Sequence, residues 1–461
     1  MRNRIGFLLI TVVFLLPGIG LKAQEKAYQD VANTIIDSAL VHQKAYYLLR
    51  ELTSQIGGRL SGSPQAAAAV EWGRQTFMKT GADRVFLQPV MVPHWVRGPQ
   101  ETAAVVNSSQ LGTVPLTITA LGGSVATPSG GLTAEVVEVK SLKEAAALGE
   151  KARGKIVFYS RPMDRRLRRT FLAYGGAVDQ RVAGPSVAAK VGAVAVLVRS
   201  MTTRLDDVPH TGTLHYMEGV KRIPAAALST MDSELLSSLL KKEPHLRVHM
   251  EMRPRWLPDV LSYNVIGEIR GSEKPEEIVL LGAHLDSWDL AQGAHDDGTG
   301  IVQVIEALRL IKKLGLKPKR TIRGVLYMNE ENGLRGGLAY ADSSAHNGWK
   351  HIAAMESDAG GFTPVGVGVS APDSIVKSIA RWSYLLKQIN ADRISKGGGG
   401  ADISPLKKFG VPMLGLRVVS HRYFDYHHSA LDTFDKVNPR ELELGAATMA
   451  IMAYVLAMEG I

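Results

Sequence analysis

Residues able to bind metal ions recur where the apolar runs of this sequence stop. Their side chains are carboxylates and imidazoles, the donors that divalent metals take from a chain without cysteine. Most of these residues follow an apolar run, one opens the helix that comes after such a run, and two form a histidine pair near the C-terminus. The full set is His284, Asp296, Glu330, Glu331, Asp358, His427 and His428. Two imidazoles and three carboxylates meet the needs of two zinc ions that share one bridging ligand, and one carboxylate remains as a base.

The runs before these residues predict the strands of one sheet. Residues 278–283 are continuously apolar, which is typical of a strand buried on both faces, and 321–328, 352–355 and 411–418 are predicted as further strands. In open α/β sheets, ligands bind just past the carboxyl ends of the strands. We therefore expect the metal-binding side chains to converge at one sheet edge.

Each motif also has a simpler interpretation. Asp296 and Asp297 could cap the helix predicted over 301–311, and Glu330 and Glu331 could lie in an exposed loop. Asp286, two residues after a histidine, could accept the second imidazole N–H and fix its tautomer. Because four strand ends carry such residues, a shared metal site is the better interpretation.

The order of the predicted elements indicates an α/β fold in two parts. Residues 24–112 and 255–461 predict one domain, a mostly parallel sheet sandwiched by helices. Residues 113–254 contain short β-branched runs separated by glycine and proline, which predict a separate inserted unit. A length of 461 residues, about three usual domains, agrees with this division.

The composition excludes several classes of protein. Zero cysteines exclude disulfides, thiolate zinc sites and cysteine nucleophiles. The net charge of +10 is spread along the chain without a run of five or six like charges, which favours a solvated surface over nucleic-acid binding. No Gly-x-Ser-x-Gly motif is present, which argues against an α/β-hydrolase serine enzyme.

The first 23 residues predict a secretory signal peptide. Arg2 and Arg4 precede an apolar stretch over 6–20, and Ala23 offers a small residue at the cleavage site. About 15 apolar residues are short for a membrane span, which needs roughly 20, and no later 18-residue window is expected to qualify. We therefore expect a secreted or periplasmic protein without a stable membrane anchor.

Together these motifs resemble the co-catalytic zinc aminopeptidase and carboxypeptidase family. The resemblance covers most of the mature chain and is carried by 56–63, 284–297, 400–405 and 426–429. It implies that 113–254 is an inserted protease-associated domain. It also implies two Zn²⁺ ions per chain, a peptide substrate, a homodimer and a cis bond between Asp296 and Asp297.

The resemblance assigns the metal ligands one by one. It implies that Asp296 bridges both ions, that His284 and Asp358 complete one site, and that Glu331 and His428 complete the other. His428 rather than its neighbour is the implied ligand because it directly precedes a serine and lies four residues before Asp432.

Three further residues receive roles from the same resemblance. Glu330 is implied as the general base, and Asp286 as the residue that orients a ligand histidine. His427 stands where relatives often carry a tyrosine that polarises the scissile carbonyl, and both that role and packing within its loop remain open.

These inferences predict a secreted di-zinc metallopeptidase that hydrolyses dipeptides or short peptides with a free N-terminus. The first alternative is a general N-terminal aminopeptidase acting on longer peptides. A glutaminyl cyclase with a single zinc ion and a non-catalytic binding protein on the same fold are the others.

Overall fold

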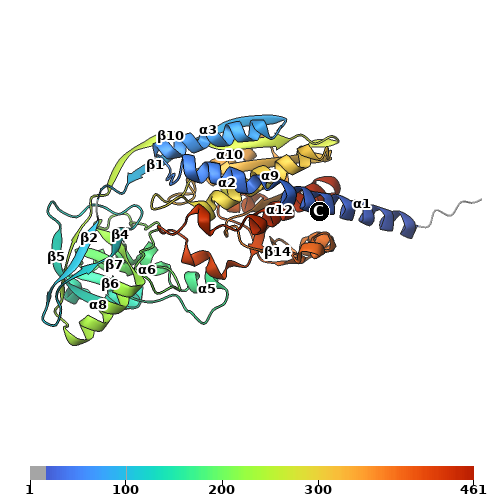
Figure 1. Cartoon of the computed structure of the whole chain (residues 1–461). Coiled ribbons are helices and arrows are strands. Elements are labelled where there is room, and N and C mark those ends of the chain that lie inside the picture. The colour runs from blue at the N-terminus through green and yellow to red at the C-terminus, as the bar shows by residue number, and fades with distance from the viewer. Residues whose placement is uncertain (1–16, 100) are drawn as a thin grey trace, which may run out of the picture.

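The computed structural model describes residues 17–99 and 101–461, and its elements form two units that meet along one side (Figure 1). The predicted leader falls largely outside the described residues. Helix α1 (Pro17–His42) begins within its last residues.

The larger unit is built on an eight-stranded mixed sheet. Its four central strands are parallel, and so is the edge pair β14·β15, but the pairs β1·β10, β10·β12 and β14·β16 are antiparallel. Four of the seven strand pairs therefore follow the predicted mostly parallel arrangement. Parallel strands are usually covered on both faces, as the central strands are here. Strands at the flanks of a sheet need not be covered on both faces, so they can pair in antiparallel fashion. In order across the sheet the strands are β1 (Arg84–Val96), β10 (Arg255–Ile269), β12 (Arg320–Tyr327), β11 (Lys274–His284), β13 (Lys350–Glu356), β16 (Met413–Val418), β14 (Pro364–Ser370) and β15 (Arg393–Lys396).

Helices cover both faces of this sheet because its strands are apolar on both sides. In β11, Val279 and Leu281 point into one apolar core, whereas Leu280 points into a core on the opposite face. The first core is covered by α1, α2 (Lys44–Gln55), α3 (Pro64–Lys79), α9 (Thr299–Lys313) and α12 (Pro439–Glu459). The second is covered by α10 (Arg335–Asn347) and η4 (Ser404–Phe409). The remaining elements of this unit are α11 (Asp373–Ala380), η2 (Ala294–Gly298), η3 (Arg381–Ile389), η5 (Ser420–Asp425) and η6 (Phe434–Lys436).

Helix α12 is the central helix of the first core. Asn438 caps its N-terminus by accepting the N–H of Glu441, and Pro439 occupies the first turn. The helix is long and apolar enough to qualify as a membrane span, so the prediction that no later segment would qualify was wrong. Its apolar window is 83% buried inside the protein, as expected for a core helix.

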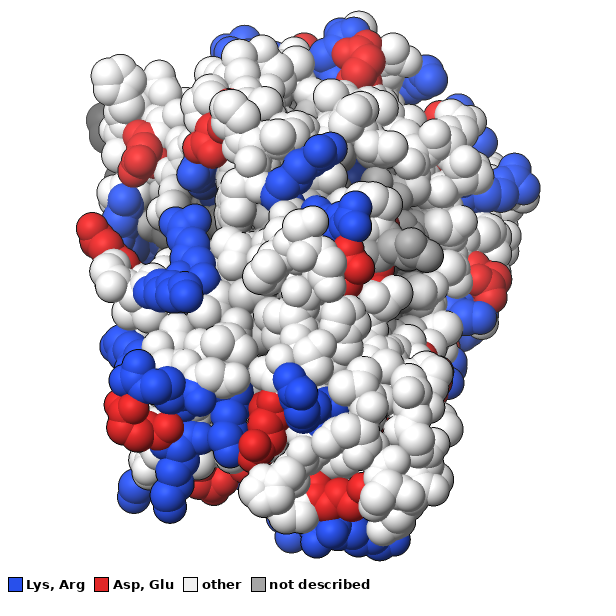
Figure 2. Space-filling model, turned by 90° about the vertical axis from the view of Figure 1, so that its left-hand side faces the viewer, with Lys and Arg blue, Asp and Glu red and all other residues white. Residues whose placement is uncertain are grey.

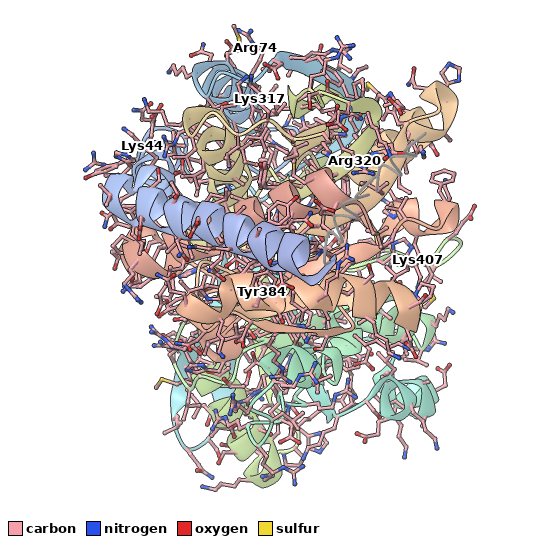
Figure 3. The ribbon with its side chains drawn as sticks, turned by 90° about the vertical axis from the view of Figure 1, so that its right-hand side faces the viewer. Lys44, Arg74, Lys317, Arg320, Tyr384 and Lys407 are labelled. Atoms are coloured by element: carbon pink, nitrogen blue, oxygen red, sulfur yellow. The ribbon has the colours of Figure 1, made fainter. Side chains whose placement is uncertain are left out.

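Helix α1 lies across the outside of the larger unit, above Tyr384 in the view of Figure 3. Tyr28 of α1 packs edge-on against Trp382, with ring centroids 5.5 Å apart. Its hydroxyl also bonds to Glu459 at the end of α12. The helix is therefore fixed to the C-terminal part of the chain.

The smaller unit has its own eight-stranded sheet and two apolar cores. Its strands, in order, are β3 (Gly112–Leu116), β2 (Thr102–Ser108), β9 (Arg247–Glu251), β5 (Leu132–Val139), β6 (Ile156–Tyr159), β7 (Ala195–Arg199), β8 (Ala225–Leu228) and β4 (Ile118–Ala120). Its helices are α4 (Leu142–Ala147), η1 (Gly149–Ala152), α5 (Thr170–Gly175), α6 (Asp179–Val182), α7 (Gly184–Lys190) and α8 (Thr230–Lys242).

The boundaries of this unit differ from the predicted 113–254. Strand β2 pairs with β9 and β3, so the second sheet already begins at Thr102, and it ends at Glu251. The polar turn before residue 113 joins β2 to β3 within one hairpin, and a hairpin turn resembles a linker in the sequence. The chain leaves the first sheet through β1 and returns through β10, which pair along their length.

The surface at the end of the smaller unit is mixed in charge. Figure 2 shows Lys and Arg side chains beside Asp and Glu side chains, around a largely uncharged centre. This distribution is that of an ordinary solvated surface.

Candidate metal centre

His284 lies at the end of β11 and is 1% exposed. Its Nε2 atom is 3.1 Å from Asp296 Oδ1 and 3.6 Å from Asp358 Oδ1. Its Nδ1 atom is 3.0 Å from the backbone carbonyl oxygen of Asp286 but 3.8 Å from the carboxylate of that residue. The backbone of Asp286, rather than the predicted side chain, therefore fixes the imidazole.

The Asp286 carboxylate instead holds the loop after β12. It accepts the backbone N–H groups of Asn329, Glu330 and Glu331 at 2.9, 3.0 and 3.4 Å. The parallel register of β11 and β12 sets this contact, because it pairs His284 with Tyr327 and so brings the two following loops together. Asp286 thus positions the two successive glutamates.

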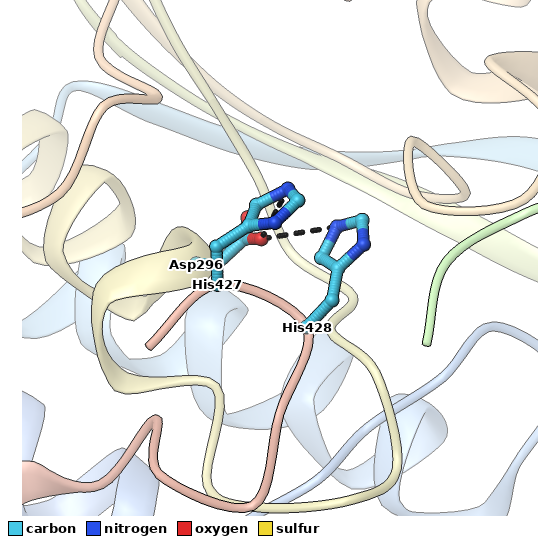
Figure 4. Close-up of side chains that lie close together, drawn as sticks. All are labelled: Asp296, His427 and His428. Carbon is cyan, nitrogen blue, oxygen red and sulfur yellow. Dashed lines mark ion pairs between the residues drawn. The ribbon is translucent and has the colours of Figure 1, made fainter. Parts of the chain in front are cut away.

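Asp296 presents its two carboxylate oxygens to two different groups of side chains. Oδ1 faces His284 at 3.1 Å, whereas Oδ2 lies 3.3 Å from His428 Nε2 and 3.8 Å from His427 Nε2 (Figure 4). The residue is 4% exposed, and Oδ2 has no hydrogen-bond donor among the described residues. A buried carboxylate oriented in this way has the geometry of a bridging ligand. The peptide bond between Asp296 and Asp297 is cis, as the resemblance implied.

Two buried residues that sequence reasoning did not assign hold the loop before Asp296. Asp432 accepts the backbone N–H groups of His295 and Asp296 at 2.7 and 3.1 Å. Arg59 is fully buried and donates to the carbonyl oxygens of Leu285 and Gln292 at 2.7 and 2.9 Å. Arg59 lies in the motif at 56–63 and Asp432 lies four residues after His428, and these motifs were the sequence signal that could have identified them.

Glu331 and His428 meet on the other side of Asp296. His428 Nε2 is 3.0 Å from Glu331 Oε2, and Glu331 Oε1 accepts the backbone N–H of Trp288 at 3.1 Å. The His427 ring stacks on His428 with centroids 3.4 Å apart, and it also packs against Phe424 at 4.9 Å. His427 therefore both reaches the cluster and packs within its loop, so the structure is compatible with both open roles.

The charges of this cluster require a cation. Burial raises the pKa of Glu331 to about 7, and the nearby Asp296 carboxylate acts in the same direction. Burial lowers the pKa of His428, but the negative charges of Glu331 and of the nearby Asp296 outweigh it and raise the pKa to about 10. For His284, the hydrogen bond to Asp296 and the charge of Asp358 likewise outweigh burial and raise the pKa. Carboxylates this close are stabilised only by protonated imidazoles or by bound metal ions.

A cleft of about 430 Å³ opens onto these residues, and both units of the protein line it. Asp296, Glu330, Glu331, Asp358, His427 and His428 come from the larger unit, and Phe171, Tyr174, Arg181 and Thr213 come from the smaller one. The units are joined beside the cleft, where Thr211 N–H donates to the His428 carbonyl at 2.8 Å and His210 Nδ1 lies 2.7 Å from the His427 carbonyl. The four residues of the smaller unit carry no sequence motif and were not predicted.

Comparison with known proteins agrees with this geometry. Residues 264–453 match the model of peptidase family M28. Carboxypeptidase Q of Mus musculus is 38% identical over 95% of this chain and 91% of its own length. The chain belongs to peptidase family M28. Both the resemblance to co-catalytic zinc peptidases and the prediction of a zinc-dependent exopeptidase are thereby confirmed.

Solved structures of similar proteins share the architecture. A peptidase M28 precursor from Shewanella amazonensis is 37% identical, has a TM-score of 0.90, and is matched over 95% of this chain and 98% of that one. A zinc aminopeptidase from Bacillus subtilis shares the fold at 21% identity, with a TM-score of 0.65 over 90% of this chain and 94% of that one. The α/β fold class predicted from the sequence is confirmed.

Proposed function

We propose that this M28 peptidase uses two zinc ions to hydrolyse dipeptides or short peptides with a free N-terminus. The observation that carries the proposal is the Asp296 carboxylate, whose two oxygens face different sets of imidazole and carboxylate donors at the base of a cleft. One bridging carboxylate between two donor sets is the ligand arrangement that a two-metal site needs.

In this proposal each ion has three protein ligands. His284, Asp358 and Asp296 would hold one ion, and His428, Glu331 and Asp296 would hold the other. The donors are nitrogen and oxygen atoms of imidazole and carboxylate groups, which suit zinc, and the unpartnered Asp296 Oδ2 supports the second site. Zinc supplies a Lewis acid that polarises the scissile carbonyl and acidifies water.

Glu330 serves as the general base. It lines the cleft beside Asp296 and Asp358, and its backbone N–H is fixed by the Asp286 carboxylate at 3.0 Å. Burial raises its pKa well above 4.5, and the neighbouring carboxylates act in the same direction, whereas bound cations would lower it. Glu330 takes a proton from the attacking water and delivers it to the nitrogen of the leaving amine.

The preference for short peptides is supported by the second wall of the cleft. Phe171, Tyr174 and Arg181 of the smaller unit face the metal ligands and limit the space beyond them. The curated relatives at 38% identity carry the name Carboxypeptidase Q, which supports assignment to that branch of the family.

The experiment is a product-resolved digest by protein reconstituted with zinc. A dipeptide, its N-acetyl derivative and a matched pentapeptide are compared by kcat/KM, with bound zinc counted on the same protein. We expect two zinc ions per chain, rapid cleavage of the dipeptide and little cleavage of the acetylated form. Sequential trimming of the pentapeptide at a higher rate would instead indicate a general N-terminal aminopeptidase.

Three further features belong to the same proposal. We infer that residues 1–23 direct export, that the unit inserted between β1 and β10 is a protease-associated domain, and that the mature protein forms a homodimer. N-terminal sequencing of the mature protein tests the first inference. Sedimentation equilibrium tests the third.

A further inference from the structure

Arg181 is a buried cation in the cleft wall that lacks an acidic partner. It belongs to α6, is 4% exposed and lines the same cleft as Glu330 and His428. Its hydrogen bonds within the described chain go only to neutral groups, the hydroxyl of Tyr174 and two backbone carbonyls. Arg199, also buried in the smaller unit, is by contrast paired with Glu234 at 2.8 Å. A buried charge is costly unless a partner compensates it, so Arg181 is suited to an anionic ligand.

The guanidinium of Arg181 is held rigidly and keeps free donors. Nη2 donates to the Tyr174 hydroxyl at 2.7 Å, Nε to the Thr213 carbonyl at 3.3 Å and Nη1 to the Thr211 carbonyl at 3.4 Å. A guanidinium has five N–H groups, so one remains on each terminal nitrogen. Two such N–H groups can be accepted by the two oxygens of one carboxylate.

Arg181 also lies beside a metal ligand. A Cβ atom built on Gly212 would be 2.3 Å from Arg181 Nη1 and 2.7 Å from His428 Nδ1, so both side chains pack against this glycine. Any larger residue at position 212 would separate them. The free cation is therefore close to the half of the centre formed by His428 and Glu331.

This placement matches the chemistry of a short peptide. Each residue of an extended peptide spans about 3.5 Å, so the C-terminal carboxylate of a dipeptide lies one residue beyond its scissile carbonyl. A longer peptide places a neutral amide at that point and leaves the charge of the buried guanidinium uncompensated. A site built to bind a charged group discriminates strongly against a substrate that lacks it.

We propose that Arg181 binds the C-terminal carboxylate of a dipeptide substrate and thereby limits the length of peptide that the enzyme accepts. The proposal rests on the exopeptidase function proposed above and names the residue that selects its substrate. Tyr174 and the Thr211 and Thr213 carbonyls act as the frame that orients the guanidinium.

The test compares a dipeptide with its C-terminal amide, which differs only in lacking the carboxylate. Wild-type protein should prefer the free acid. Arg181→Gln should lower kcat/KM for the acid by roughly 10- to 100-fold, the size expected for a lost charge-assisted hydrogen bond, and should change kcat/KM for the amide by less than about 3-fold. Arg166→Gln is the matched control, because Arg166 is an exposed arginine of the same unit, paired with Asp164.

Arg181→Lys keeps the charge without the planar pair of donors, and it should retain part of the preference for the acid. If circular dichroism shows that Arg181→Gln is unfolded, Arg181→Lys alone decides the test. Equal losses on acid and amide would overturn the proposal, because they would indicate a purely structural role. Wild-type protein that cleaves the amide as fast as the acid would overturn it but leave the exopeptidase function intact, whereas cleavage of neither would overturn both.

Discussion

Replacement of Asp286 by asparagine tests whether this carboxylate holds the loop that carries Glu330 and Glu331. The residue is fully buried and accepts two close backbone N–H bonds, at 2.9 and 3.0 Å, and a longer one at 3.4 Å. A hydrogen bond to a charged acceptor contributes about 1.5–3 kcal/mol, against about 0.5–1.5 kcal/mol for a neutral one. If each close bond weakens by about 1 kcal/mol, the free energy of unfolding should fall by about 2 kcal/mol.

The same substitution should lower activity. Residues that orient metal ligands typically change metal affinity or activity by about 10- to 100-fold when they are mutated, and Asp286 positions both a proposed ligand and the proposed base. We therefore expect Asp286→Asn to lose kcat in this range and to bind its second zinc ion more weakly. Urea unfolding, zinc titration and kcat on a dipeptide measure the three effects.

Asp83→Asn provides the control. Asp83 also accepts a backbone N–H, from Arg270 at 2.9 Å, but it lies at the surface beside Lys312. It should leave kcat unchanged and cost less than about 1 kcal/mol of stability. An Asp286→Asn variant with the unfolding free energy and kcat of the wild type would refute the proposed role of the carboxylate.

Three further outcomes are expected. Glu330→Gln should lower kcat by about 10²- to 10⁴-fold with both zinc ions retained, and a folded variant that has lost zinc would show by metal analysis that Glu330 is a ligand. Asp296→Ala should lose both ions and Asp358→Ala mainly one, whereas unchanged zinc content in Asp296→Ala would contradict the bridge. Burial raises the pKa of Glu443 to about 8, above its unfolded value near 4.5. Between these pH values the folded protein holds a proton that the unfolded chain has lost, so the free energy of unfolding falls as the pH rises, by up to roughly 1.4 kcal/mol per pH unit. Glu443→Gln should remove this decline, and urea midpoints of the two proteins that change in parallel from pH 5 to 8 would contradict it.

The strand ends of the metal centre could be predicted because burial leaves a clear pattern in the sequence. The run 278–283 is apolar on both faces, and the polar residues that follow it must lie at the sheet edge. The structure brings His284, Asp296 and Asp358 together at that edge. Composition and order therefore contained most of the information on which side chains meet.

The contacts between the loops could not be predicted in the same way. Asp286 was expected to reach His284, but its carboxylate serves residues 329–331, because the register of β11 against β12 decides which loop lies opposite. Strand register depends on partners distant in the sequence, and no local pattern encodes it. Arg181 escaped prediction for the same reason, since its place in the cleft depends on how the smaller unit docks.

The hairpin between 102 and 116 shows a related limit. Its turn has the composition of a linker, so the predicted boundary fell inside a pair of strands. Only the pairing of β2 with β9, almost 150 residues further along the chain, assigns it to the second sheet.

His427 and His428 contact both units of the protein. Their rings enter the candidate metal centre, whereas their carbonyl oxygens bond to His210 and Thr211 of the smaller unit. Exchange of the Thr211 amide hydrogen with solvent requires that the bond to His428 opens. A ligand that immobilises the His428 ring should therefore slow exchange at Thr211, although this amide belongs to the other unit. By thermodynamic reciprocity, the free energy that holds the two units together should also contribute to the affinity of the proposed metal centre for zinc.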